Sequence, residues 1–133
     1  MKLSEYLMRF IGAPYVWAGD GSGKCGGGYD CSGLVLEGLW ALGWIDKPDR
    51  KAKDIYAHLE KTWIHVPRGL ESQDDILFFG KDLKNITHTA VAIGDGLMIE
   101  AYGTSKCTSA DKSTGKVHVR PIRDNIVAAL RRP

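Results

Sequence analysis

The chain has 133 residues, 44% of them apolar, and its 18 basic residues nearly balance its 16 acidic ones. This size predicts a single domain over residues 1–133 with a core of its own. The basic residues are scattered rather than gathered on one helix, which argues against a nucleic-acid partner. No apolar run is long enough for a membrane span, and we expect a chain made without a leader peptide.

Apolar spacing predicts three helices in the first half of the chain. The first runs from Leu3 to Ile11, before Gly12 and Pro14. A loop with six glycines covers residues 19–28. The second helix begins at Cys31 and is closed by Gly43, and the third covers residues 51–61.

After Pro67 the spacing of the apolar residues changes to that of strands. We expect strands over residues 75–79, 87–93, 97–102, 117–120 and 126–130, the last of which also fits a helix. The strand over 87–93 alternates like a half-buried strand, and a tight turn at residues 94–96 joins it to the next as a hairpin. Helices first and strands afterwards predict an α+β domain in which the N-terminal helices pack on an antiparallel sheet.

Three cysteines, Cys25, Cys31 and Cys107, contain no CxxC pair, so neither a disulfide framework nor a zinc site is the natural interpretation. Cys31 stands at the predicted start of a helix, where unpaired N–H groups and the helix dipole favour a thiolate. It is therefore the candidate nucleophile, although an isolated cysteine on an apolar helix is often a small core residue. Cys25 is a weaker alternative, since no helix follows it.

The predicted hairpin supplies partners for this thiol. Residues paired across the turn have position numbers that sum to about 188 or 190, which places His88 opposite Glu100 or one diagonal step away. Glu100 can then orient one imidazole nitrogen while the other faces Cys31, giving a Cys, His and carboxylate triad. No partner is predicted for His118.

Four segments together resemble the NlpC-type, papain-like cysteine peptidases, which cut the stem peptides of peptidoglycan. They are GAPYVWAG (12–19), YDCSGLV (29–35), DDILFFG (74–80) and HTAVAIGDGLMIEA (88–101). The resemblance implies a papain-like fold, Cys31 as nucleophile and His88 as base. It departs at Glu100, where the family most often has a histidine, and at Ala18, where it has glycine.

The resemblance also implies the rest of the site and the substrate. Tyr15 and the backbone N–H of Cys31 are expected to bind the oxyanion, and Trp17, Asp30 and Ser32 are the further candidates for oxyanion or substrate binding. The expected reaction is hydrolysis of a peptidoglycan stem peptide next to a D-glutamyl residue, without a metal or other cofactor. With no leader expected, the protein would be made in the cytoplasm and reach the wall after lysis, injection or phage delivery, as a phage endolysin or tail peptidase does.

Two other functions remain open on the sequence. Glu100, the acidic third member of the predicted triad, also suits an acyltransferase, thioesterase or deamidase that acts on a substrate outside the wall. The fold could also serve as an inactive wall-binding or phage structural module. Against this last alternative stands the complete set of catalytic residue types.

Overall fold

The computed structural model describes residues 1–13, 30–46, 51–103 and 115–133. The helical elements in these ranges are α1 (Leu3–Leu7), the 3-10 turn η1 (Met8–Phe10), α2 (Cys31–Ala41) and α3 (Ala52–Leu59). The strands are β1 (Ile64–His65), β2 (Ile76–Gly80), β3 (Ile86–Gly94), β4 (Leu97–Tyr102), β5 (Lys116–Pro121) and β6 (Ile126–Arg131). None of the helices in the described part of the chain has the length and apolarity that a membrane span requires.

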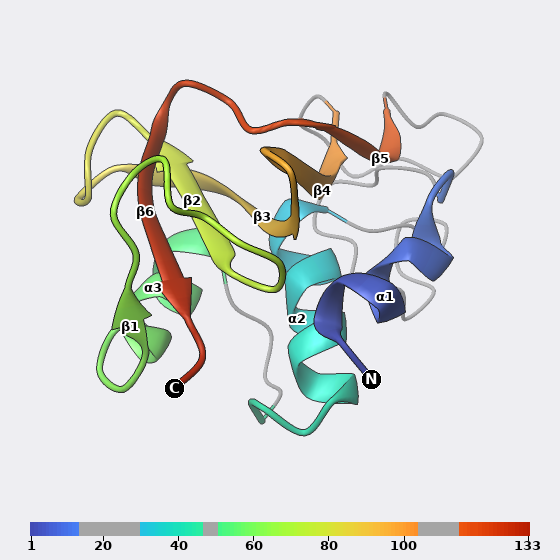
Figure 1. Ribbon diagram of the computed structural model, residues 1–133, viewed down its shortest axis with the longest axis horizontal. Coiled ribbons are helices and arrows are strands. Elements are labelled where there is room, and N and C mark those ends of the chain that lie inside the picture. Colours follow the sequence, from blue (N-terminus) through green and yellow to red (C-terminus); the bar gives the residue numbers. More distant parts are fainter. Residues whose placement is uncertain (14–29, 47–50, 104–114) are drawn as a thin grey trace.

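The strands form one antiparallel sheet in the order β1-β6-β2-β3-β4-β5 (Figure 1). The α+β architecture, with helices packed on an antiparallel sheet, is confirmed. The segment over residues 126–130 is a strand rather than a helix, because it pairs with both β1 and β2. The sequence did not predict β1, which has only two residues, both exposed.

Both faces of the sheet centre are buried. Along β2, Ile76 and Phe78 join the cluster that contains the helices, whereas Leu77 and Phe79 join a second cluster built mainly from the strands. Successive side chains of a strand point to opposite faces, so the second cluster covers the other side of the sheet. The prediction of a half-buried strand over 87–93 was therefore wrong for the centre of β3, where residues 90–92 are all buried.

Helix α2 is the central helix and ends as the sequence predicts. Its backbone stops at Ala41, and Gly43 then takes the left-handed conformation with φ +74°. Gly38 lies against α1, where a Cβ atom would stand 2.5 Å from Cδ1 of Leu3. The absence of a side chain at Gly38 therefore allows α1 and α2 to pack closely.

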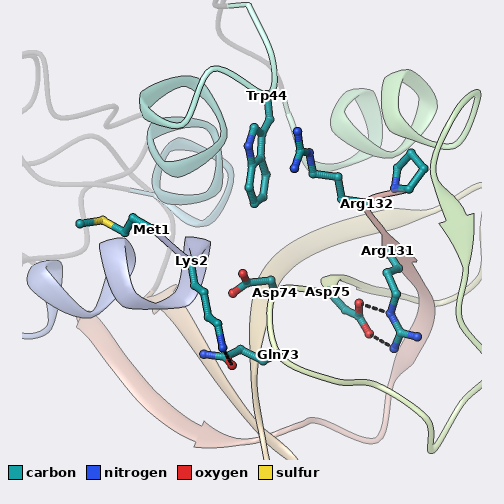
Figure 2. Close-up of a pocket in the computed structure, with 9 residues that line it drawn as sticks. Met1, Lys2, Trp44, Gln73, Asp74, Asp75, Arg131 and Arg132 are labelled. Carbon is teal, nitrogen blue, oxygen red and sulfur yellow. Dashed lines mark hydrogen bonds and ion pairs between the residues drawn. The ribbon is translucent and has the colours of Figure 1, made fainter.

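Helix α1 has no capping side chain of its own and takes its cap from the segment before β2. The Asp74 carboxylate accepts hydrogen bonds from the backbone N–H groups of Leu3 (3.1 Å) and Ser4 (2.8 Å). The next residue, Asp75, is 1% exposed and binds the Arg131 guanidinium through both carboxylate oxygens (Figure 2). These two aspartates tie α1 and β6 to the strand at the middle of the sheet.

Candidate active site

The N-terminal end of α2, which begins at Cys31, lies next to β3 and β4 (Figure 1). Asp30 precedes the helix in an extended conformation, and its Oδ1 accepts hydrogen bonds from the Gly33 backbone N–H (2.6 Å) and from the Ser32 hydroxyl (3.3 Å). This is an N-cap, which fixes the first turn of the helix. Cys31 is the first helical residue, and its half-buried side chain carries a free thiol. The geometry gives Asp30 and Ser32 a structural role, and substrate binding by either residue stays a prediction.

The hairpin places His88 and Glu100 as the sequence predicts. Val91 pairs with Ile99 and Ala92 with Met98, so the position numbers of these pairs sum to 190, and the register shifts by one at the Gly94–Leu97 pair beside the turn. His88 and Glu100 are then diagonal neighbours on one face, and His88 Nε2 lies 2.6 Å from Glu100 Oε1. The structure therefore brings the imidazole and the carboxylate into direct contact.

His88 contacts both other members of the predicted triad. Burial of the ring disfavours its charged form, but hydrogen bonds to Cys31 and Glu100 outweigh this effect and raise the His88 pKa from 6.5 to about 9. Because Nε2 is used by Glu100, Nδ1 is the nitrogen that remains for the thiol. The ring is held between a carboxylate and a sulfur, and at neutral pH its charged form is favoured.

Glu100 has two partners that the sequence analysis missed. His118 Nε2 lies 2.7 Å from Glu100 Oε2, and the Arg123 guanidinium donates to both carboxylate oxygens. Burial disfavours the Glu100 anion, but hydrogen bonds from His88, Arg123 and His118 outweigh it and lower the Glu100 pKa to about 2. No partner was predicted for His118. It pairs with Glu100 across β4 and β5, a register that could not be deduced because residues 103–115 join these strands without a turn signal of fixed length.

These groups have the composition of a cysteine hydrolase site. A thiol, an imidazole in contact with it, and a buried carboxylate on the far ring nitrogen can form a thiolate with an imidazolium beside it. Within the described ranges, no three His, Cys, Asp or Glu side chains are arranged to hold a metal ion. Of the other predicted site residues, Tyr15 and Trp17 fall in the ranges not described, as do Cys25, Cys107 and the glycine loop.

A cavity of about 330 Å³ lies at the other end of α2 (Figure 2). Trp44, just beyond that helix, lines it together with residues near both termini. The 11 residues of α2 span about 16 Å, which separates Cys31 from this cavity. Two of its charged groups pair with neighbours, Lys2 with Gln73 and Asp75 with Arg131, and neither cysteine nor histidine is among its described lining residues. The cavity is therefore distinct from the candidate active site.

The chain is similar in sequence to known proteins. Residues 12–126 match the sequence model of the NlpC/P60 family. The peptidoglycan endopeptidase RipB of Mycobacterium tuberculosis is 31% identical over 132 residues, which cover 90% of this chain and 48% of RipB. The gamma-DL-glutamyl hydrolase of Bacillus subtilis is 31% identical over 100 residues, covering 75% of this chain and 22% of that protein. The chain thus spans about half or less of the length of these relatives.

Solved structures show the same fold. The P60 domain of the Mycobacterium avium subspecies paratuberculosis antigen MAP1204 matches with a TM-score of 0.71 and 28% identity, covering 98% of this chain and 90% of that one. RipD of M. tuberculosis, a non-catalytic NlpC/p60 domain protein adapted to peptidoglycan binding, matches with a TM-score of 0.69 over 98% of this chain and 93% of that one. At 24% identity RipD supports the fold alone. Whether such a domain is catalytic therefore has to be argued from its site residues.

Proposed function

The chain belongs to the NlpC/P60 family, and we propose that it is a cysteine endopeptidase that hydrolyses stem peptides of bacterial peptidoglycan. The observation that carries the proposal is the contact of His88 with both Cys31 and Glu100. A buried carboxylate on the ring nitrogen opposite the thiol favours a catalytic domain over a non-catalytic wall-binding one, because it can orient and charge the imidazole.

The first half of the proposed reaction forms an acyl-enzyme. His88 takes the thiol proton, and the Cys31 sulfur attacks the carbonyl carbon of the scissile amide, forming a C–S bond and an oxyanion. The backbone N–H of Cys31, at the start of α2, is proposed to stabilise that oxyanion together with the Tyr15 hydroxyl. The imidazolium then gives its proton to the leaving nitrogen, and the C–N bond breaks.

The second half releases the product. Neutral His88 takes a proton from water, the hydroxide attacks the thioester carbon, and the C–S bond breaks to return the thiolate beside an imidazolium. Glu100 stays ionised throughout, because its pKa of about 2 lies far below neutral pH. Its role in the proposal is to hold the ring and favour its charged form.

Two relatives support the choice of substrate. RipB is a peptidoglycan endopeptidase, and the B. subtilis relative is a gamma-DL-glutamyl hydrolase. We propose that this chain also cleaves next to a D-glutamyl residue of the stem peptide.

The test is digestion of purified muropeptides, followed by mass spectrometry of the products. The wild-type chain is expected to cut the stem peptide next to D-glutamate, and Cys31→Ala is expected to leave it intact. Urea unfolding of both proteins checks that the variant is folded. Turnover of acyl esters or thioesters with no cleaved muropeptide would favour a papain-like thioesterase or acyltransferase instead. Wall binding without any turnover would favour an inactive module.

A further inference from the structure

The Glu100 carboxylate forms more hydrogen bonds than are needed to orient His88 alone. Oε1 lies 2.6 Å from His88 Nε2 and accepts from Arg123 Nε at 3.2 Å. Oε2 lies 2.7 Å from His118 Nε2 and accepts from Arg123 Nη2 at 2.6 Å. The side chain of Glu100 is fully buried. Four hydrogen bonds use the approximately four acceptor positions of a carboxylate, so this group is fixed against rotation.

Arg123 and His118 keep the Glu100 anion paired when His88 loses its charge during the proposed reaction. His88 is protonated before attack and neutral after it has given its proton to the leaving group. With His88 as its only partner, Glu100 would become an uncompensated buried anion at that stage, which is costly. Arg123 keeps its charge throughout, because a guanidinium does not lose its proton in proteins. Glu100 therefore remains paired in both protonation states of His88.

Tyr102 encloses the same cluster. The Arg123 guanidinium lies 4.0 Å from the centroid of the Tyr102 ring, and the His118 ring is stacked on it at 6.2 Å. The rings of Tyr102 and His88 also form a T-shaped contact, with 5.9 Å between their centroids. Because Tyr102 is 47% exposed, its ring lies between this cluster and solvent. The tyrosine thus packs on the three basic groups that surround Glu100.

We infer that Arg123 and His118 are positioning residues: they hold Glu100 in one orientation, and through it they orient the His88 ring toward Cys31. The inference rests on the proposed function for its catalytic consequence, and on the hydrogen bonds alone for its geometry. The rival explanation is structural, in which the ion pairs only fasten β5 and the segment before β6 to β4. Stability alone does not separate the two explanations.

The molecule contains a matched control. Arg131 binds the buried carboxylate of Asp75 through Nε (2.9 Å) and Nη2 (2.8 Å), as Arg123 binds Glu100, but it lies beside the remote cavity. Arg131→Gln therefore breaks the same kind of ion pair without touching His88. A purely structural role predicts that Arg123→Gln and Arg131→Gln behave alike.

The experiment compares Arg123→Gln, Arg123→Lys and Arg131→Gln in the full chain. With muropeptide as substrate, Arg123→Gln is expected to lower kcat by about tenfold to a hundredfold with KM nearly unchanged, since a misplacement of ~1 Å can cost ~100-fold. Arg123→Lys keeps the charge but not the two-point contact, so an intermediate rate is expected. Arg131→Gln is expected to retain the wild-type kcat.

A second readout needs no substrate. The proton between His88 Nε2 and Glu100 is expected as a far-downfield resonance in proton NMR, because the hydrogen bond is short and shielded from solvent. His118→Gln, which keeps a donor near Glu100 Oε2, separates this signal from that of His118. Loss or broadening of the His88 signal in Arg123→Gln, with retention in Arg131→Gln, is the expected result.

The outcomes keep the two proposals apart. If the wild-type protein cleaves muropeptides, and kcat and the His88 signal are the same in both glutamine variants, positioning by Arg123 is overturned. If Arg123→Gln does not fold, a wild-type kcat and signal in Arg123→Lys overturns it. If the wild-type protein cleaves nothing while the NMR signal still depends on Arg123, positioning stands and the peptidase function fails.

Discussion

Replacing Glu100 by glutamine tests the electrostatic core of the site. The substitution keeps the size of the side chain and removes its charge. One carboxylate oxygen becomes an NH2 group, which cannot accept hydrogen bonds from His118 or Arg123. His88 can still be oriented by the remaining carbonyl oxygen, so we expect reduced rather than abolished activity.

The magnitude follows from the charge state of His88. Its pKa is raised from 6.5 to about 9 by Cys31 and Glu100 together, and an adjacent opposite charge typically contributes about one to three units. Loss of about 1.5 units would leave the variant pKa near 7.5, so that about a quarter of the rings are charged at pH 8 instead of about nine-tenths. The charged fraction is nearly complete in both proteins at pH 6. The ratio of wild-type to variant kcat/KM should therefore grow about fourfold between pH 6 and pH 8.

The assay is kcat/KM on a muropeptide from pH 5 to pH 10, with the His88 ring titrated by NMR in parallel. A His88 pKa raised in the folded state predicts that the active form is present below pH 9 and lost as the pH rises through that value. Glu100 itself does not titrate in this range, because its pKa is about 2. Asp75→Asn is the matched control, since it neutralises another buried carboxylate that pairs with arginine. If kcat/KM of folded Glu100→Gln falls at the same alkaline pH as that of the wild type, the reasoning is refuted.

Three further substitutions test other parts of the structure. His88→Ala removes the base and is expected to reduce turnover nearly to that of Cys31→Ala, as measured by muropeptide digestion. Asp30→Ala removes the N-cap of α2 and should lower the free energy of unfolding by about 1 kcal/mol in urea titration, whereas Asp30→Asn should cost much less. Gly38→Ala places a Cβ 2.5 Å from a Leu3 methyl group, and the overpacking should outweigh the gain in helix propensity, for a net loss of about 1 kcal/mol. Equal or greater stability of Gly38→Ala would show that α1 can move away from α2 at little cost.

The sequence predicted the hairpin well because its register depends on local information. The glycines at positions 94 and 96 indicate a tight turn, and both adopt the positive φ that such a turn requires. The two-residue period of the strands then determines which side chains share a face. The proximity of His88 and Glu100 on one face follows from these facts, whereas the register and the 2.6 Å contact come from the structure. Similarly, the start of α2 could be located because Asp30 is a good N-cap and apolar spacing begins directly after it.

The partners of Glu100 could not be predicted in the same way. His118 belongs to β5, and the chain between β4 and β5 is too long for a turn type to fix which residues pair. Arg123 lies in the loop between β5 and β6, where neither the helix period nor the strand period predicts the direction of a side chain. A signal was nevertheless present, since a glutamate within the buried stretch of β4 requires basic partners, and residues 116–123 contain a histidine and two arginines to which no role had been assigned.

The burial of β3 was underestimated for a related reason. Alternation in sequence shows that one face of a strand is apolar, but it cannot show whether the small residues of the other face are also covered. Ala90 and Ala92 are covered by Leu77, Phe79 and Met98 from neighbouring strands, which form the second cluster. Small side chains at these positions allow that packing, and their weak hydrophobicity gives little indication of it in the sequence.

His88 lies at the edge of this second cluster, with its ring 5.5 Å from that of Phe79. The site therefore combines an apolar wall with a set of charges around Glu100. The wall excludes water from one side of the ring, which strengthens every interaction of His88 with Cys31 and Glu100 but also disfavours the charged imidazole. The charged form prevails because hydrogen bonds to Cys31 and Glu100 raise the His88 pKa despite burial. Glu100 in turn is kept an anion by hydrogen bonds from His88, Arg123 and His118, which lower its pKa. Control of the protonation state of His88 thus extends to β5 and to the segment before β6, beyond the three residues that would carry out the chemistry.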